Sequence, residues 1–440
     1  MIKSILDFFN TYFFGPALPG VIFIAGAFLL IKYGSFIIFK PGKVISVLLR
    51  KNEDSGISPL KTAILALAST LGVGNIVGVS TAIASGGPGA VFWLTLSAFA
   101  AMPLKFGEVV LAMKYRIKEG DEYRGGAMYY MRDMLKNKGL SVVFSLLCII
   151  CAFTVGNIVQ INAVAESFEK TFYIDPVAVG AVGALVVFLS VRGGAKQISE
   201  ITAKLIPFAT LCFSALSLYI IFTNTDKLLG VVMLVFKEAF SLKAAFGGIG
   251  GYAIVRAMRY GVARGILSNE AGCGTSPTAH AKSNLKSPVE QGFWGIFEVF
   301  ADTVVMCNLT AFVILLSYSE LAVGKGLTGM ELVLGAFGKY TGQFSEVVIT
   351  LSVLLFALAT IICQCFYGGE SVYYLTKNKG VLWGYKVVYC VVVAAGVFVG
   401  GGFMWTLTDF TVSVMTVINT VCILLASSEI KGEVDRYFFR

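Results

Sequence analysis

Charge is scarce in this sequence. Only 14% of its 440 residues are Asp, Glu, Lys or Arg, whereas a soluble domain of this length carries about 25%. This shortage argues against a water-soluble globular protein. The net charge of +9 does not point to a nucleic-acid partner either, because the basic residues stand in short loops between apolar runs, as they do in membrane proteins.

Histidine is also nearly absent, since His280 is the one histidine of the chain. An enzyme needs a cluster of His, Cys or carboxylates at metal-ligand or hydrogen-bonding spacing, and the sequence has no such motif. The nine cysteines lie almost entirely inside apolar runs, which is typical of small buried side chains. We therefore expect no catalytic residues and no resident cofactor. We expect His280 to be a loop or helix-end residue rather than a proton relay.

Apolar runs dominate the chain instead. Hydrophobic residues make up 57% of the sequence and the mean hydropathy is +0.80. The N-terminal MIKSILDFFNTYFF lacks a small-residue cleavage site, so we do not expect a cleaved signal peptide. We predict an all-α integral membrane protein with about 11 transmembrane helices, at residues 16–39, 59–84, 89–114, 141–168, 176–192, 203–224, 247–272, 288–318, 343–376, 381–400 and 403–428.

Lysine and arginine alternate between successive loops. Residues 40–61 hold five of them, residues 85–89 hold none, and residues 114–138 hold seven. Loops rich in Lys and Arg face the cytoplasm. The pattern predicts a multi-pass protein of the cell (inner) membrane, in contact with lipid, with its N-terminus outside and its C-terminus in the cytoplasm.

Two of the predicted spans carry glycine-bearing interruptions. Residues 71–79 read LGVGNIVGV, and residues 265–274, five spans later, read GILSNEAGCG. Five is odd, so the two spans cross the membrane in opposite directions. Two inverted halves of five helices, each opening with an interrupted helix, are typical of secondary transporters. The predicted organisation is an N-terminal segment, a first repeat, a second repeat and a cytoplasmic tail, at 1–58, 59–224, 225–428 and 429–440.

The interruptions suggest which ligand would bind. The N-terminus of a half-helix suits a carboxylate, and the carbonyl end suits a cation or an ammonium group, so an α-amino acid fits the pair. Oxygen atoms of Asn75, Ser268, Asn269 and Thr360 would suit Na⁺, a hard cation. Two purely structural roles stay open: Asn75 could make only an interhelical hydrogen bond, and the glycines could serve only close helix packing.

Four stretches of the sequence are familiar, namely GNIVGVSTAIASGGPGAVFW, GGAMYYM, GVARGILSNEAGCGTSPTAHAKS and EVFADTVVMC. Together they resemble the alanine or glycine:cation symporter family, from about residue 58 to the last helix. The resemblance implies the leucine-transporter fold, with broken first and sixth core helices. It also implies uptake of a small neutral amino acid of the alanine or glycine class, coupled to Na⁺ and in some members to H⁺.

The resemblance also implies site residues. Substrate binding falls on the two broken helices and the eighth core helix, at Thr70, Leu71, Gly72, Val73, Gly74, Asn75, Gly78, Leu267, Ser268, Asn269, Gly272 and Gln364. Sodium binding falls on backbone and side-chain oxygens, at Ala68, Leu71, Asn75, Ser268 and Thr360.

Three departures from the family pattern modify these expectations. Ala359 replaces a hydroxyl beside Thr360, which would weaken sodium binding. Gln364 replaces a tryptophan, so we expect a longer or more polar substrate than alanine, such as glutamine or serine. Arg256 and Arg259 lie where the family is neutral, and we expect Arg259 to pair with Asp409 as an outer gate. The alternative is an arginine that reaches the lipid headgroups.

Three other functions compete with a sodium-coupled symporter. A channel would show a short filter repeated by oligomerisation, and a membrane enzyme would need the polar cluster that is missing. A carrier of the same fold could take another small solute, with protons as the coupling ion. The sequence does not identify the amino acid or the oligomeric state.

Overall fold

The computed structural model describes residues 2–50, 57–120, 122–240, 249–399 and 401–439. Nearly all of this part of the chain is helical, and its one sheet is an antiparallel hairpin of β1 (Ile117–Glu119) and β2 (Glu122–Arg124). The helices that build the centre are α5 (Pro59–Thr70), α6 (Val77–Gly86), α7 (Ala90–Lys114), α9 (Lys138–Phe153), α10 (Val159–Phe172), α11 (Pro176–Val191), α12 (Gly194–Thr223), α14 (Ile249–Asn269), α15 (Pro277–His280), α16 (Pro288–Val299), α17 (Asn308–Leu316), α19 (Gln343–Thr376), α20 (Lys379–Gly396) and α21 (Gly401–Leu425).

Shorter or peripheral elements surround this centre. An N-terminal rod runs through α1 (Ile2–Phe8), η1 (Phe9–Phe14), α2 (Gly15–Leu29) and η2 (Leu30–Gly34), and α2 packs against α7. π-helical turns join α9 to α10 and α16 to α17, at η4 (Thr154–Ile158) and η6 (Phe300–Cys307). The other short elements are α3 (Phe36–Phe39), α4 (Pro41–Leu48), α8 (Ala127–Asp133), α13 (Thr225–Ala239), η7 (Ser319–Gly324), α18 (Gly329–Thr341) and α22 (Ser427–Phe439).

The first glycine-bearing span is broken, as the sequence predicts. Ser58 caps α5 by accepting a hydrogen bond from the Lys61 backbone N–H, and Pro59 occupies the first turn, where no N–H is needed. The helix ends at Thr70, passes through a short 3₁₀ turn, η3 (Val73–Asn75), and resumes as α6. The two helical parts meet at an angle of 62°.

The second glycine-bearing span is broken as well. α14 ends at Asn269, and the chain makes a series of turns before α15 begins at Pro277. Gly272 and Gly274 both have φ of +78°, a conformation that favours glycine. The first two positions of the predicted span, 247 and 248, lie outside the described residues.

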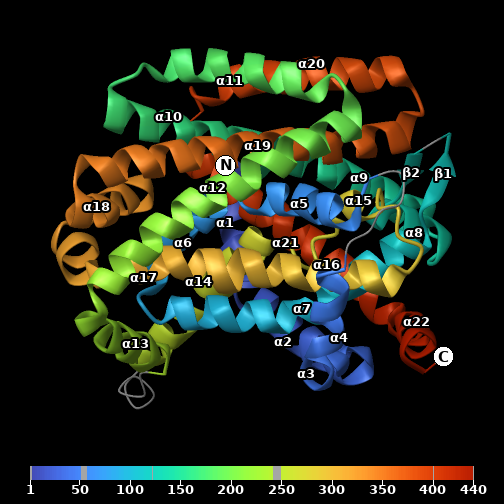
Figure 1. Ribbon diagram of the computed structural model, residues 1–440, viewed down its shortest axis with the longest axis horizontal. Helices are drawn as coiled ribbons and strands as arrows, with labels where there is room; N and C mark the ends of the chain where they lie inside the picture. The colour runs from blue at the N-terminus through green and yellow to red at the C-terminus, as the bar shows by residue number, and fades with distance from the viewer. Residues whose placement is uncertain (1, 51–56, 121, 241–248, 400, 440) are drawn as a thin grey trace.

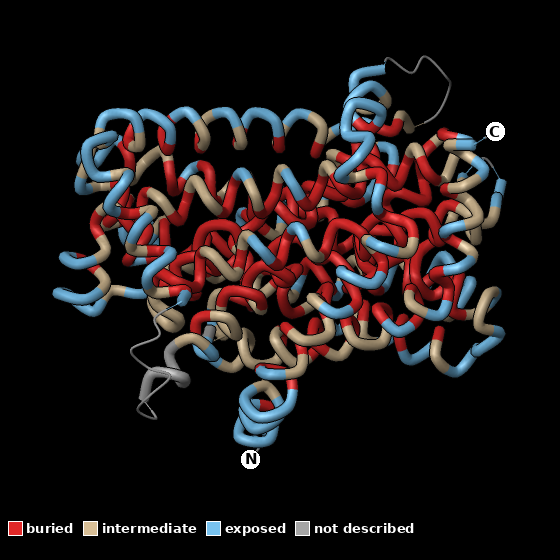
Figure 2. The backbone as a smooth tube through the Cα atoms, turned by 90° about the horizontal axis from the view of Figure 1, so that it is seen from below, coloured by how far each residue is buried: buried red, intermediate tan, exposed pale blue. Residues whose placement is uncertain are grey.

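Long helices cross the molecule on both sides of the breaks (Figure 1). On one side α11 packs beside α20, and α19 contacts α9, α10 and α12. On the other side α7 packs against α14 and α16. Figure 2 shows that the buried backbone fills the middle of the molecule and that exposed segments lie around it.

The outer surface carries many apolar side chains. Ile24, Leu211 and Val182 have exposed fractions of 75%, 68% and 62%, as expected of helices that face lipid. Eight helices are long and apolar enough to span a membrane, or nine if the bent pair counts as one span, among the described residues. α11, with 16 residues, is shorter than that test requires. The predicted total of about 11 and the inverted repeat stay predictions.

The role of Gly261 in the close packing of α14 against α7 can be tested by substitution. A Cβ at Gly261 would lie 2.3 Å from the backbone oxygen of Ala90, so Gly261→Ala should force the two helices apart and cost about 1–3 kcal/mol. We expect a lower thermal unfolding temperature in detergent. Gly230→Ala is the matched control, because a Cβ there meets nothing within 4 Å; equal loss in both variants would contradict this account of the packing.

Candidate functional site

The two breaks face each other at the centre of the molecule. A Cβ added at Gly74 would lie 3.7 Å from the Cα of Ser268, so the unwound part of the first broken helix contacts the end of α14. Small residues at this point permit the close approach of two backbones. The breaks therefore form one site rather than two separate ones.

A cavity lies beside this contact. Five of the predicted substrate residues line it, namely Thr70, Gly72, Gly74, Leu267 and Gln364, and so does the predicted sodium ligand Thr360. Its other walls come from Ser69, Val155, Gln160, Glu270 and Trp405. Helices from both halves of the chain thus contribute to the cavity.

The space around position 72 has no room for a side chain, so the residue there must be glycine. A Cβ at this position would lie 2.7 Å from the Thr360 hydroxyl oxygen and 3.0 Å from Oε1 of Gln160. Both neighbours are polar groups on the cavity wall. The glycine therefore brings the broken backbone within reach of α19 and α10.

Several predicted substrate residues lie close to the cavity without appearing on its wall. Leu71 and Val73 are buried, and the Val73 N–H donates to Oε1 of Gln160 at 3.0 Å. Asn269 donates to Thr303, and the Gly272 carbonyl accepts from Asn419. A Cβ added at Gly78 would lie 3.9 Å from Cδ of Arg264. The hydrogen bonds of Val73, Asn269 and Gly272 stabilise the breaks.

The predicted sodium ligands fall into two groups. In the first, the Thr360 hydroxyl lies 3.0 Å from the Ala68 carbonyl oxygen, and the adjacent Leu71 ends the same helix. In the second, Asn75 and Ser268 surround the carboxylate of Asp302, with Asn75 Nδ2 2.7 Å from Oδ1 and Ser268 Oγ 2.7 Å from Oδ2. The buried Asp302 belongs to η6, and π-helical turns are frequent at functional sites.

The amide of Asn75 is oriented differently from the expectation. Its oxygen accepts from the Gly72 N–H at 3.0 Å, while its nitrogen faces Asp302 and Ser268. A carboxylate can only accept, so it selects the nitrogen. In this arrangement the amide oxygen of Asn75 stabilises the first break. It does not lie with the oxygens of Ser268 and Asp302.

Gln364 bonds to the second break. Its Nε2 donates to Oε1 of Glu270 at 2.7 Å, and Oε2 of Glu270 accepts from the Thr275 hydroxyl at 2.5 Å. Glu270 has φ of +50°, so this residue forms part of the turn itself. The amide of Gln364 thereby connects α19 to the unwound segment.

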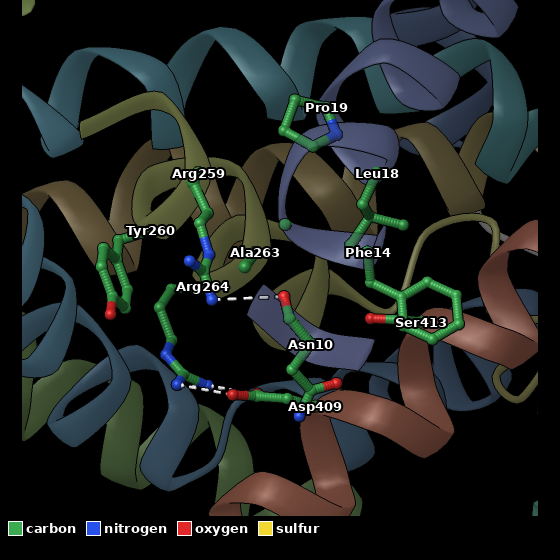
Figure 3. Close-up of a pocket in the computed structure, with 11 residues that line it drawn as sticks. Asn10, Phe14, Leu18, Pro19, Arg259, Tyr260, Ala263, Arg264, Asp409 and Ser413 are labelled. Atoms are coloured by element: carbon green, nitrogen blue, oxygen red, sulfur yellow. Dashed lines mark hydrogen bonds and ion pairs between the residues drawn. The ribbon is translucent and has the colours of Figure 1, made fainter. Parts of the chain in front are cut away.

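The outer gate predicted at Arg259 and Asp409 has the wrong arginine. Arg264 pairs with Asp409 through two hydrogen bonds of 2.7 and 3.0 Å, and the Arg264 guanidinium also lies 5.0 Å from the centre of the Trp405 ring. Arg259 donates instead to the backbone oxygen of Asn10 (Figure 3). Arg264 lies five residues further along the helix and nearer the break, which brings it to the depth of Asp409.

A second group of charges joins the β1–β2 hairpin to α19. Nη1 of Arg124 on β2 lies 2.7 and 2.8 Å from the two carboxylate oxygens of Glu370 on α19, and Lys282 lies 3.3 Å from the same carboxylate. Burial acts to lower the pKa of Arg124, but the charge and hydrogen bonds of Glu370, together with the nearby Glu122 and Glu119, raise the pKa above the usual arginine value. The hairpin and the segment after α15 are therefore tied to α19 by ion pairs.

Comparison with known proteins identifies the family. A sequence model of the sodium:alanine symporter family matches residues 1–440. The chain belongs to this family. Its members are transporters, not enzymes, so this symporter-family protein is a multi-span secondary transporter.

Relatives and solved structures agree with this assignment. Sodium/alanine symporter AgcS of Methanococcus maripaludis is 31% identical over 444 residues, which cover 99% of this chain and 97% of AgcS. Amino-acid carrier protein AlsT of Bacillus subtilis is 31% identical over 406 residues, which cover 92% and 85%. The crystal structure of MhsT in complex with L-phenylalanine has a TM-score of 0.65 and 14% identity, over 87% of this chain and 93% of MhsT. This likeness confirms the leucine-transporter fold.

Six residues of the site were not predicted as ligand contacts, among them the cavity-wall residues Ser69, Val155 and Glu270. Gln160 and Trp405 line the cavity, and Asp302 stands in the second oxygen group. A polar residue inside an apolar span is the signal that would have pointed to Gln160, and the same signal marks Asp302 in the sequence as a residue with a structural or a transport role. Trp405 gives no such signal, because one more aromatic residue in an apolar span is unremarkable.

The ion pair between Arg264 and Asp409 can be tested by mutation. Arg264→Ala leaves Asp409 without its partner, so we expect the initial rate of transport in proteoliposomes to fall roughly tenfold, equivalent to about 1.4 kcal/mol. Exchanging the two residues, Arg264→Asp with Asp409→Arg, should recover part of the loss. Arg259→Ala is the control and should change the rate little; if it proved as damaging as Arg264→Ala, the assigned pair would be wrong.

Proposed function

We propose that this protein is a sodium-coupled symporter of a small neutral amino acid. The observation that carries the proposal is the oxygen pair of Ala68 and Thr360, 3.0 Å apart, directly beside a cavity that lies between two broken helices. Carbonyl and hydroxyl oxygens suit Na⁺, and unwound helix ends suit both groups of an amino acid. At such close sites, the binding of the ion and the binding of the substrate would be coupled.

The substrate carboxylate would bind at the first break. The N–H of Val73 is already held there by Oε1 of Gln160, which imitates a carboxylate oxygen. An incoming amino acid would replace this bond, and Gln160 would be free to turn toward it. Gln160 is therefore part of the proposed substrate site.

The substrate side chain would meet Gln364. Because its Nε2 donates to Glu270, its carbonyl oxygen is the group left for a ligand, and this oxygen makes no hydrogen bond within the described part of the chain. An acceptor at this position favours a side chain that donates, such as the hydroxyl of serine or the amide of glutamine. The acidic Glu270 behind it disfavours acidic amino acids.

Alternating access follows from the two charge clusters. The pair Arg264–Asp409 would close the cavity at one end, and Arg124 with Glu370 would close the opposite end. In the orientation that the basic loops favour, the first end faces outward, and the N-terminus lies outside with the C-terminus in the cytoplasm. Opening one cluster while the other stays closed would move the substrate across the membrane.

A proton-coupled carrier of another small solute is the second candidate. It is favoured by Ala359, which is buried next to Thr360 and offers no hydroxyl to a sodium ion. The buried carboxylate of Asp302 could take a proton in place of a metal cation.

Sodium dependence separates these candidates. We expect calorimetry with the twenty amino acids to show binding of a small neutral one in Na⁺ and loss of that binding when choline replaces Na⁺. Thr360→Ala should weaken the apparent sodium affinity roughly tenfold, by the loss of one oxygen ligand of about 1.4 kcal/mol. Ala359→Ser should strengthen it. Binding that is equal in Na⁺ and choline, with Thr360→Ala unchanged, would contradict sodium coupling.

Substrate preference tests the role of Gln364. Gln364→Trp removes the acceptor and fills the cavity, so uptake of serine and glutamine should fall relative to alanine and glycine, by roughly tenfold or more, because a hydrogen-bonding site discriminates strongly. Gln364→Leu removes the acceptor without filling the cavity, so it separates the effect of the lost hydrogen bond from the effect of the lost space. An unchanged ranking of the four substrates in both variants would show that Gln364 does not contact the side chain.

A further inference from the structure

A second polar region lies inside the protein, on the inner side of the breaks. Its centre is His280, the last residue of α15. It does end a helix, as expected, but it is fully buried and bonded at both ring nitrogens. Nε2 lies 3.0 Å from Oε2 of Glu298, and Nδ1 lies 2.7 Å from Nε2 of Gln291.

The hydrogen bonds around Gln291 determine where the imidazole protons are. Thr62 donates its hydroxyl to the Pro59 carbonyl, so its oxygen accepts from Nε2 of Gln291. The second hydrogen of that nitrogen goes to Nδ1 of His280, which must then accept. The imidazole is therefore neutral in this arrangement, with its one proton on Nε2 and donated to Glu298.

This arrangement leaves one buried atom without a partner. Oε1 of Gln291 is buried and makes no hydrogen bond within the described residues. Turning the amide by 180° would place that oxygen against Nδ1 of His280 and against Thr62. The oxygen could then accept from an imidazole that carries protons on both nitrogens, so each orientation of the amide matches one charge of His280.

The charges nearby favour an additional proton. Lys105 is fully buried and lies 3.1 Å from Glu298 and 3.6 Å from Glu108, and His280 shares Glu298 with it. When both carboxyls are ionised, a proton on His280 balances the second negative charge, and unbalanced charge is costly in a dry interior. The titratable groups near His280 and its partners are Lys105 and Glu108 on α7, Glu298 on α16, Asp302 on η6, Glu270 in the second break, and Cys363 and Tyr367 on α19.

We propose that Glu298, His280 and Gln291 form a proton-binding site, separate from the cavity, that links the inner halves of the two broken helices. Histidine changes its charge between about pH 5 and pH 8. Lys282, two residues after His280, lies 3.3 Å from the exposed carboxylate of Glu122, so the chain reaches the surface close to the site.

Protonation would change a contact between α15, α16 and α5. With neutral His280, Gln291 donates to Thr62 on α5. With charged His280, the amide turns, and the Thr62 hydroxyl must leave the Pro59 carbonyl and donate to Gln291 instead. The proton thereby alters how α5 is held, and only this consequence for transport rests on the proposed symporter function.

The single histidine of the chain makes the site directly observable. We would label the protein with ¹⁵N-histidine, use an affinity tag without histidine, and record the ring signals in lipid nanodiscs from pH 9 to pH 5, without sodium or amino acid. We expect the neutral Nε2–H form at high pH and protonation of both nitrogens as the pH falls. A ring that stays neutral, or stays doubly protonated, over this range would overturn the proposal.

Two substitutions should move the titration in opposite directions. Glu298→Gln removes the carboxylate that holds the imidazolium, so half-protonation should require a pH lower by about one unit or more. Gln291→Glu supplies a second carboxylate and should raise that pH by a similar amount. Glu331→Gln is the control, since this exposed residue pairs with Lys170, and it should change nothing. A titration that neither substitution moves would also overturn the site.

The last experiment measures the pH dependence of uptake. If the site influences α5, the pH dependence of uptake should follow the measured protonation of His280 and flatten in His280→Gln, after this variant is shown to fold by its unfolding temperature. A pH profile that stays the same in His280→Gln would refute the effect on transport. The ring titration needs no substrate. It therefore tests the proton-binding site even if the proposed sodium coupling proves wrong.

Discussion

Backbone polar groups inside this protein must find partners where neither water nor lipid can supply them. Each orphaned N–H or C=O in such surroundings costs several kcal/mol by general estimates. At the first break, Asn75 and Gln160 bond the N–H groups of Gly72 and Val73. At the second, Asn269 and Glu108 bond those of Ala271 and Gly274, and Asn419 donates to the Gly272 carbonyl. These side chains come from several helices, so neither break could exist in isolation.

The same constraint explains why the few charges are arranged in pairs. Arg264 and Asp409 lie at one end of the molecule, and Arg124, Lys282 and Glu370 at the other. Only where both partners are held by surrounding helices can such charges lie beneath the surface. Both groups of charges join elements that lie far apart in the sequence.

The site is shared among elements that contact one another through polar groups. α19 supplies Thr360 to the first break and Gln364 to the second. η6 supplies Asp302, which contacts residues of both breaks. α15, which follows the second break, ends in His280, and His280 contacts α16 and, through Gln291, α5. These polar contacts connect the two breaks to each other.

Local patterns predicted much of this arrangement from the sequence alone. Long apolar runs identify a membrane protein, and the glycines at 72, 74, 272 and 274 locate the breaks, because backbone conformation and close approach depend on local residue type. Pairings between distant side chains could not be predicted in this way. Arg259 and Arg264 lie five residues apart on one helix, and only the crossing of α14 and α21 decides which of them reaches Asp409. The burial of His280 among Glu298, Gln291 and Thr62 likewise depends on how three helices pack, because side-chain partners are determined by the relative positions of whole helices and not by the sequence next to each residue.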